Sequence, residues 1–268
     1  MLYIVATPIG NLEDITLRAL RVLKEVDTIA AEDTRHTRKL LNAYDIKTRC
    51  VSFHEHSNEE KRAFILSELK EGRNIALVSD AGTPLISDPG AALVREAVEQ
   101  GLSVTSVPGP CAAVTAVTLS GIGGPFYFLG FLSKKTGERK KQIEQLKEFS
   151  MPAVIYESPH ALHETLCAMQ SQLGEQRHVV VAKELTKLHE RVFSGTLAQA
   201  VCEFDGDVKG EYVLVLDGAE NTCEEVSDSD IEKEIAKLLA AGMTKKDAAK
   251  AASEKFGISK NRAYRLTL

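Results

Sequence analysis

The sequence predicts an α/β protein with two α/β domains and a small helical domain near its C-terminus. Over the first 220 of its 268 residues, short β-branched runs alternate with amphipathic helical segments, which is typical of α/β folds. Glycine and proline clusters follow most of the apolar runs, whereas residues 230–268 hold helical patterns alone. The length also exceeds that of a usual single domain. We therefore expect α/β domains at 1–118 and 119–220, a linker at 221–229 and a small basic helical domain at 230–268.

The first half has five predicted strands, at 2–6, 28–31, 49–53, 74–79 and 102–107. A helix is expected over 16–26, with Leu17, Leu20 and Leu23 on one face. The spacing Ser57-Asn58-Glu59-Glu60 is that of a capping box, which predicts a helix ended by Gly72. Asp88-Pro89 is interpreted as the N-cap and first residue of another helix, ended by Gly101. This alternation favours right-handed crossovers and a mostly parallel sheet.

The second half repeats the alternation with strands predicted at 126–131, 153–157, 178–184, 191–195 and 211–218. Its helices are expected at about 137–149, 159–173 and 196–204. Residues 118–126 are rich in glycine and apolar, as expected of a hinge between domains. Residues 219–230 are acidic and lose the apolar periodicity, which favours a linker. The tail then holds three short helical stretches, separated at Gly242 and Gly257.

Composition excludes several classes of protein. Hydrophobic residues make up 44% and charged residues 26%, as in an ordinary globular chain. No apolar run approaches the ~20 residues of a membrane helix, and we interpret the N-terminus as a buried strand, not a signal peptide. The five cysteines are scattered, which favours a reducing cytoplasm. Two histidine pairs, His54 with His56 and His160 with His163, lack a third ligand, so no metal is expected.

The charge is unevenly distributed along the chain. The net charge is −5, but residues 243–268 hold seven Lys and Arg against two acids, a local +5 that leaves −10 for residues 1–242. Residues 133–147 are basic too, either as a solvated helix face or as a contact for phosphate. The tail resembles a helix-turn-helix with Gly257 in the turn and Ser259 as a cap; it is either solubilising or binds nucleic acid.

Clusters of Gly, Pro and polar residues lie at the ends of the predicted strands. In open parallel sheets, ligands bind beyond the carboxyl ends of the strands, where Gly permits close backbone approach. Each cluster by itself could only mark a turn, but their number favours a site in the cleft. No G-x-G-x-x-G follows the first strand and no P-loop motif occurs, so the residues themselves indicate only a small polar ligand held by backbone groups. The clusters are ATPIGN (6–11), EDTRHT (32–37), HEHS (54–57), SDAGTPLISDPG (79–90), VPGPCAA (107–113), YESPH (156–160) and KELTK (183–187).

Several of these motifs, in this order, resemble the tetrapyrrole-methylase-like superfamily, and more closely its branch that methylates small-subunit ribosomal RNA. The resemblance covers about residues 1–218. It implies two α/β domains with S-adenosylmethionine in the cleft between them, and commonly a homodimer. Where tetrapyrrole methylases have a G-D-P core, this chain has Gly82-Thr83-Pro84, which favours the RNA-modifying branch. By motif alignment, the residues implied to line the cofactor site are Pro8, Gly82, Thr83, Pro84, Ile86, Pro108, Gly109, Cys111, Ala112, Tyr156 and Glu157.

Methyl transfer to a ribose hydroxyl asks the protein mainly to align the reacting atoms. A base or a nearby cation should help, because the hydroxyl is weakly acidic. Carboxylates or His54 could accept the proton, and Arg35 or Lys183 could stabilise the developing charge or bind phosphate. In the alternative interpretation, residues 32–34 cap the following helix and Arg35 lies on its solvated face. The candidates at strand ends are Glu32, Asp33, Arg35, His54, Lys183 and Glu184.

The resemblance thus implies a cytoplasmic enzyme that uses S-adenosylmethionine to methylate the 2′-oxygen of a cytidine ribose in the decoding region of 16S RNA. Its expected partners are 16S RNA or the small ribosomal subunit and a second copy of the chain, without membrane or metal. A tetrapyrrole or a protein side chain is the alternative substrate within the fold. A non-catalytic regulator that binds nucleic acid is the alternative from another class. The basic tail suits either RNA hypothesis.

Overall fold

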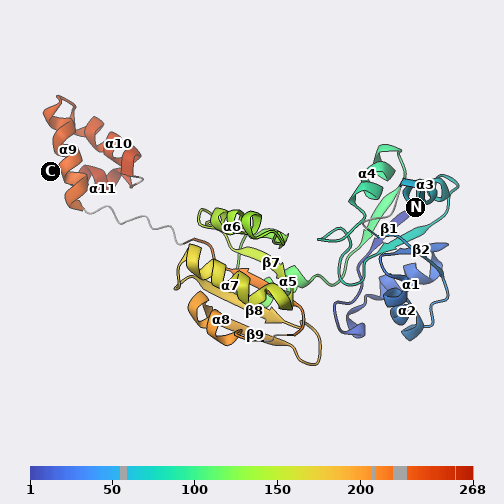
Figure 1. The fold of residues 1–268 in the computed structure, drawn as a ribbon. Helices are drawn as coiled ribbons and strands as arrows, with labels where there is room; N and C mark the ends of the chain where they lie inside the picture. Colours follow the sequence, from blue (N-terminus) through green and yellow to red (C-terminus); the bar gives the residue numbers. More distant parts are fainter. Residues whose placement is uncertain (55–58, 207–208, 220–227, 257, 268) are drawn as a thin grey trace. The chain divides into compact units, whose positions relative to one another are not determined.

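The computed structural model describes residues 1–54, 59–206, 209–219, 228–256 and 258–267. Contacts divide the chain into two compact units, Met1–Ala219 and Glu220–Leu268. Each of the ten strands predicted from the sequence is present, within two residues at either end. The first unit carries two five-stranded sheets, and the residues described in the second unit form helices without strands (Figure 1). The predicted α/β class is therefore confirmed.

The first sheet, predicted to be mostly parallel, is parallel throughout. Its strand order is β3-β2-β4-β1-β5, so β4 lies between β1 and β2, and β5 pairs with the other side of β1. The carboxyl ends of all five strands consequently lie along one edge of the sheet. The strands are β1 (Leu2–Val5), β2 (Thr28–Ala31), β3 (Arg49–Ser52), β4 (Ile75–Val78) and β5 (Val104–Val107).

Helices cover both faces of this sheet (Figure 1). Alternate strand residues point to opposite faces, so Ala76 and Val78 join one core while Ile75 and Leu77 join the other. The first core contains residues of α1 (Leu17–Glu25) and α2 (Thr34–Ala43), and the second contains residues of α3 (Glu59–Lys70) and α4 (Ala91–Glu99). A short 3₁₀ helix, η1 (Leu12–Asp14), precedes α1.

Two details of the predicted helices are wrong. Leu17 is the first residue of α1 and 86% exposed, because the buried stripe of that helix runs through Ala19, Val22 and Leu23. Asp88 and Pro89 do not open α4: its N-cap is Gly90, with φ of 121°. A β-carbon at Gly90 would lie 2.7 Å from Leu77 Cδ2, so close packing selects glycine there. Ser57 and Asn58 of the predicted capping box lie outside the described residues.

The second sheet is mixed, with strand order β6-β7-β10-β8-β9. β6 and β7 are parallel, whereas β10 runs antiparallel to both β7 and β8. The carboxyl ends of β7 and β8 therefore share one edge with the start of β10, where Tyr212 pairs with Glu157 and Lys183. The strands are β6 (Tyr127–Phe131), β7 (Ala153–Glu157), β8 (His178–Lys183), β9 (Arg191–Thr196) and β10 (Tyr212–Leu216).

Three helices cover one face of the second sheet: α6 (Thr136–Gln145), α7 (Pro159–Leu173) and α8 (Leu197–Glu203). The other face packs against α5 (Ala112–Ser120), through Ala113 and Ala116. Residues 118–126, predicted as a hinge, therefore join α5 to β6 within the second half. The chain instead passes from β5 of the first sheet to α5 through residues 108–111.

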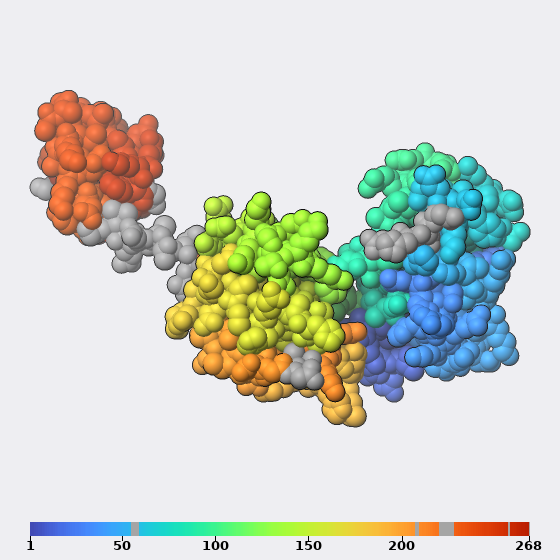
Figure 2. Space-filling view, viewed as in Figure 1, coloured from blue at the N-terminus to red at the C-terminus, as the bar shows by residue number. Residues whose placement is uncertain are grey.

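The second unit is a compact group of three helices (Figure 2). α9 (Asp228–Ala240), α10 (Lys245–Phe256) and α11 (Lys260–Arg265) pack around a small core that includes Ile231, Ile235 and Ala252. Ser259 caps α11, as predicted, by accepting the Arg262 amide hydrogen at 3.2 Å. Gly257 and most of the predicted linker at 221–229 lie outside the described residues.

Candidate functional site

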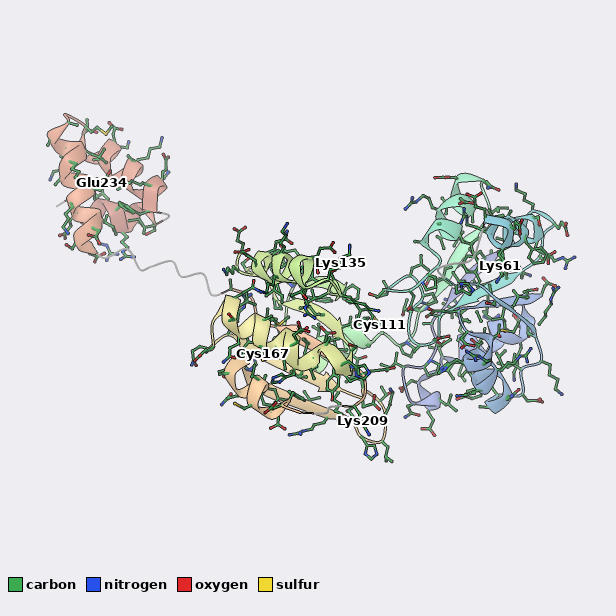
Figure 3. The ribbon with its side chains drawn as sticks, in the orientation of Figure 1. Lys61, Cys111, Lys135, Cys167, Lys209 and Glu234 are labelled. Carbon is green, nitrogen blue, oxygen red and sulfur yellow. The ribbon has the colours of Figure 1, made fainter. Side chains whose placement is uncertain are left out.

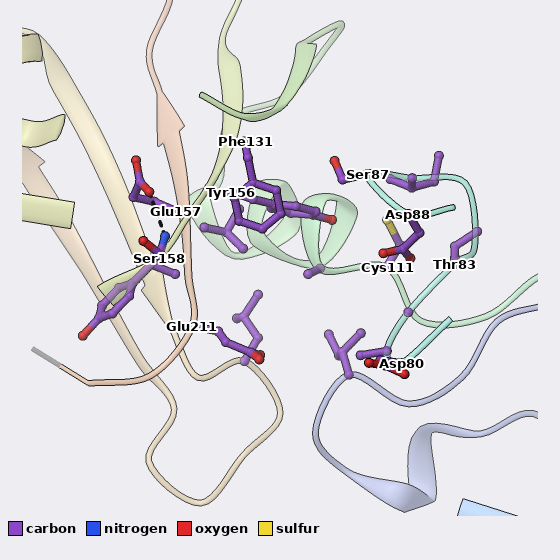
Figure 4. Close-up of a pocket in the computed structure, with 18 of the residues that line it drawn as sticks. Asp80, Thr83, Ser87, Asp88, Cys111, Phe131, Tyr156, Glu157, Ser158 and Glu211 are labelled. Carbon is purple, nitrogen blue, oxygen red and sulfur yellow. Dashed lines mark hydrogen bonds between the residues drawn. The ribbon is translucent and has the colours of Figure 1, made fainter. Parts of the chain in front are cut away.

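A cavity of about 410 Å³ lies where the strand ends of the two sheets meet (Figure 4). The first sheet contributes residues that follow β1, β2 and β4. The second contributes the ends of β6 and β7, a residue after β8 and the start of β10. The lining is Ile9, Glu32, Asp80, Ala81, Gly82, Thr83, Ile86, Ser87, Asp88, Cys111, Ala112, Phe131, Tyr156, Glu157, Ser158, Pro159, Leu185, Glu211, Tyr212 and Val213.

The loop after β4 forms one wall of the cavity and is held in a strained shape. Gly82 forms an isolated antiparallel bridge with Thr7, and the Thr83 hydroxyl donates to the Pro110 carbonyl at 2.9 Å. Leu85 and Ser87 have φ of 73° and 66°, a left-handed region that non-glycine residues seldom adopt. Strain of this kind is typical of functional loops fixed by their surroundings.

Tyr156 connects the second sheet to the start of α5. Its hydroxyl accepts the Ala113 amide hydrogen at 3.1 Å, and its ring packs edge-on against Phe131 with centroids 5.5 Å apart. Burial, and then the neighbouring Cys111, raise the pKa of the Tyr156 hydroxyl well above its usual range. Cys111 lies directly before α5, where it is labelled in Figure 3. The Tyr156 hydroxyl therefore stays protonated and serves as a neutral anchor.

Glu157 is buried and fully engaged at the end of β7. One carboxylate oxygen accepts the Ser158 amide hydrogen at 2.8 Å, and the other accepts the Thr165 hydroxyl at 2.7 Å. These bonds fix the turn between β7 and α7, which is also the Ser158-Pro159 rim of the cavity.

Three acids of the first sheet gather on the opposite wall. An Asp80 carboxylate oxygen accepts the Asp33 amide hydrogen at 2.9 Å, and Glu32 accepts the Asp80 amide hydrogen at 3.4 Å. Burial raises the pKa of Asp88 to about 6, and the negative charges of Glu32 and Asp80 add to this rise. The wall therefore carries a strong negative potential.

A second cavity, of about 420 Å³, adjoins the first. Four residues line both: Glu32, Ser87, Asp88 and Phe131. The remaining lining is Pro89, Leu129 and Gly130. A β-carbon at Gly130, where φ is 64°, would lie 2.6 Å from Ser87 Oγ, so glycine permits the close approach of β6 to the strained loop.

The structure brings together seven of the eleven residues predicted to hold the cofactor. These line the first cavity: Gly82, Thr83, Ile86, Cys111, Ala112, Tyr156 and Glu157. The other four, Pro8, Pro84, Pro108 and Gly109, lie in the same loops but are not part of the lining. Their role in binding stays a prediction.

Five of the six catalytic candidates line neither cavity: Asp33, Arg35, His54, Lys183 and Glu184. Asp33 is the N-cap of α2 and also pairs with exposed Arg35 at 2.8 Å, which lowers the pKa of its carboxylate. His54 is half-buried and belongs to neither lining. Lys183 lies 5.8 Å from the Tyr212 ring centroid. Glu184 has φ of 51° and accepts the Glu211 amide hydrogen at 2.9 Å.

Asp88, Glu211 and Phe131 are among the lining residues that the sequence interpretation did not single out as site residues. Asp88 was assigned to a helix cap, although its place in the SDAGTPLISDPG motif was a signal for the site. Glu211 lies directly before β10, which runs antiparallel to β8. A search for site residues at the carboxyl ends of strands therefore misses it. Phe131 ends β6 and is 58% exposed. The alternation of apolar residues in a strand does not predict that exposure. Glu32 was a catalytic candidate and does line both cavities.

Comparison with known families identifies the fold. The sequence profile of the family described as Tetrapyrrole (Corrin/Porphyrin) Methylases matches residues 1–201. The chain belongs to this family. Its methyl donor is S-adenosylmethionine, so the cofactor expected from the resemblance is confirmed.

Two curated relatives are similar over almost the whole chain. The Ribosomal RNA small subunit methyltransferase I of Bacillus subtilis is 44% identical, covering 98% of this chain and 92% of its own. The protein of the same name from Escherichia coli O157:H7 is 45% identical, covering 100% and 94%. The predicted resemblance to the RNA-modifying branch is thereby confirmed.

Solved structures share the fold at low sequence identity. A uroporphyrin-III-C-methyltransferase from Thermus thermophilus has a TM-score of 0.57 at 19% identity and covers 81% of this chain and 94% of its own. A cobalt precorrin-4 methyltransferase has a TM-score of 0.60 at 17% identity, covering 80% and 93%.

The first cavity fits S-adenosylmethionine in size and charge. Its volume is typical of small-molecule sites. The ligand carries a positive sulfonium and a positive ammonium, which suit the wall of Glu32, Asp80 and Asp88. Ile9, Ile86 and Leu185 add apolar surface to the lining, which contains no Lys, Arg or His among the residues described.

Among the residues that the structure describes, no group of three or more His, Cys, Asp or Glu side chains could hold a metal ion. His163 instead lies 3.4 Å from the Cys167 sulfur, and His56 falls outside the described ranges. None of the helices in the described segments has the length and apolarity needed to span a membrane.

Proposed function

We propose that this protein is an S-adenosylmethionine-dependent methyltransferase that acts on the ribose 2′-oxygen of a cytidine in 16S ribosomal RNA. The observation that carries the proposal is identity of 44–45% over nearly the full length to relatives named for small-subunit ribosomal RNA methylation. The acidic cavity at the strand ends adds a site that suits the methyl donor.

The residues of the chain bind, orient and exclude water in this reaction. When bound, S-adenosylmethionine supplies a methyl group already activated by its positively charged sulfur. The acids Asp80 and Asp88 attract that positive charge, and Tyr156 fixes the start of α5 at the cavity through Ala113. Alignment of the methyl carbon with the attacking oxygen then supplies much of the rate.

Basic surface near the cavity supports binding of RNA. Lys134, Lys140 and Lys141 are exposed on and beside α6, which follows the cavity residue Phe131 along the chain. Arg139 of the same segment is buried and paired with Glu164, so it is not available to phosphate. The segment at 133–147 thus combines a structural arginine with exposed lysines suited to phosphate.

The C-terminal unit is a second candidate contact for RNA. Over residues 228–268, nine Lys and Arg against six acids leave a net charge of +3. Three of these cations are paired within the unit: Lys233 with Asp230, Lys255 with Glu234 and Arg262 with Asp228. Lys245, Lys246 and Lys250 are exposed along α10.

We extend the proposal to a homodimer in the cytoplasm, with the small ribosomal subunit as substrate.

The substrate class is tested by offering two acceptors in separate reactions. The protein and labelled S-adenosylmethionine are incubated with undermethylated small ribosomal subunits in one reaction and with a uroporphyrinogen in another. We expect label in the 16S RNA alone. Label in the tetrapyrrole would favour the other branch, and tight cofactor binding without transfer to either would favour a non-catalytic regulator.

A further inference from the structure

We propose that the second cavity is the subsite for the target nucleoside, with Phe131 stacking on its base and Asp88 accepting the proton of its ribose 2′-hydroxyl. The inference rests on the proposed function, because it names the groups that would handle the RNA acceptor. It assigns the cavity of about 410 Å³ to the methyl donor and the adjoining one of about 420 Å³ to the nucleoside.

The first support is the shared boundary of the two cavities. A methyl group passes directly from donor to acceptor, so the two ligands must meet at one point. Glu32, Ser87, Asp88 and Phe131 line both cavities and therefore mark that point. Figure 4 shows Ser87 and Asp88 on one side of the cavity and Phe131 beside Tyr156 on the other.

The second support is the unusual exposure of Phe131. Its side chain is 58% exposed although it ends a sheet strand, whereas the next residue, Leu132, is 8% exposed. One edge contact, to Tyr156 at 5.5 Å between centroids, fixes the ring. A fixed aromatic ring at the rim of a cavity is the usual platform for an unstacked RNA base.

The third support is the surroundings of Asp88. Charged and titratable neighbours are Glu32 after β2, Asp80 in its own loop, Tyr156 on β7 and Cys111 before α5, and the Ser79 hydroxyl bonds to its carboxylate. The described linings of the two cavities contain no Lys, Arg or His, so no cationic side chain there would stabilise a free alkoxide. The reaction therefore needs a base. Burial makes Asp88 a stronger base than an exposed carboxylate, yet one that is ionised at neutral pH.

Atoms and charge balance in the resulting step. The ribose oxygen forms a bond to the methyl carbon as the carbon–sulfur bond breaks, and that electron pair stays on sulfur, which leaves as a neutral thioether. The hydroxyl proton passes to the Asp88 carboxylate and is then lost to solvent.

The base is tested with Asp88→Asn, with Glu32→Gln and with Asp45→Asn, which removes an exposed carboxylate from a distant turn. Single-turnover transfer to undermethylated small subunits is followed from pH 5 to 9 at saturating cofactor, and cofactor affinity is measured by calorimetry. We expect Asp88→Asn to slow transfer by about 10²–10⁴-fold. The wild-type rate should reach a plateau above an acid limb at or below about pH 6. The Asp88→Asn rate should instead keep rising with pH, because hydroxide replaces the base.

The platform is tested with Phe131→Leu against Phe126→Leu, a neighbouring exposed phenylalanine that lines neither cavity. Phe131→Leu should lower kcat/KM for the subunits by about 10-fold with cofactor affinity unchanged. The inference is overturned if Asp88→Asn keeps the wild-type rate and pH profile, if Glu32→Gln alone abolishes the acid limb, or if both Phe variants behave alike. Absence of ribose methylation by the wild type would instead overturn the proposed function.

Discussion

Asp88 illustrates how a single residue can serve activity at the expense of stability. Its carboxylate lies half-buried beside Glu32 and Asp80, and this placement raises its pKa to about 6. Folding therefore favours the protonated acid, whereas catalysis as proposed requires the ionised one. Active sites commonly contain such perturbed groups.

The linkage between pKa and stability gives a prediction for Asp88→Asn. Below pH 3.8 the acid is neutral in both the folded and the unfolded chain, so the variant gains nothing. Between there and about pH 6 the unfolded chain ionises first, and the free energy of unfolding of the wild type falls. Above this window the variant should be more stable than the wild type by about 1–2 kcal/mol. This is less than the full pKa shift would give, because solvent reaches the Asp88 side chain.

Urea unfolding of both proteins at pH 4 and pH 8 measures this difference. Asp45→Asn, in an exposed turn, is the control and should match the wild type at both values. A variant that is less stable than the wild type at pH 8 would contradict the raised pKa of Asp88.

At the residue scale, the sequence predicted the glycines and small residues of the cavity better than the charged residues of the cavity. Gly82 and Ala112 sit in motifs whose composition already indicates close backbone approach, and both line the cavity. Asp88 and Pro89 fit the local rule for a helix start, but Gly90 packs against Leu77 and caps α4, which begins at Ala91. Local sequence preference cannot predict that contact, because it joins a loop residue to a side chain of β4.

At the element scale, Asp33 at the start of α2 has two possible roles, as a helix cap and as a catalytic residue. The side chain accepts the Arg35 amide hydrogen at 2.8 Å and so caps the helix, while its catalytic role stays a prediction. Asp33→Ser keeps an N-cap without the carboxylate, whereas Asp33→Ala removes both.

If Asp33 acts only as a cap, Asp33→Ser should retain transfer activity within about two-fold and Asp33→Ala should lose about 1 kcal/mol of stability. Activity assays and thermal unfolding of the two variants check this. Activity lost equally in both, with Asp33→Ser fully stable, would show that the carboxylate itself is needed.

The tail helices carry a second prediction at this scale. Lys245→Ala with Lys246→Ala should reduce the slope of log affinity for 16S RNA against log salt by about one to two, because each phosphate contact contributes about 0.7–0.9. The matched control is Lys233→Ala with Lys237→Ala on α9, which removes the same charge from the same unit. Filter binding from 50 to 300 mM salt measures both, and an unchanged slope in the α10 pair would argue against contact.

Element prediction succeeded where a strand is buried on both faces. β2 and β4 are wholly buried and appear in the sequence as uninterrupted apolar runs with turn residues on either side. The antiparallel course of β10 could not be deduced in this way, since a buried strand has the same composition in either direction. That direction is what brings Glu211 to the cavity.

For the whole molecule, the local distribution of charge indicates function better than the net charge does. The net charge of −5 argues against general affinity for polyanions, and the acids concentrate where a cationic cofactor fits. Exposed lysines on α6 and α10 then offer local contacts to RNA. Such a distribution suits an enzyme with one structured RNA target, because weak, separated basic contacts add up only when the target's shape matches.

The most direct test of this account locates the transferred methyl group. Undermethylated small subunits are incubated with the protein and labelled S-adenosylmethionine, and the 16S RNA is digested to nucleosides. We predict labelled 2′-O-methylcytidine, from a single position, and no incorporation into subunits that are already methylated. Label on a base, on protein or at many positions would contradict the account.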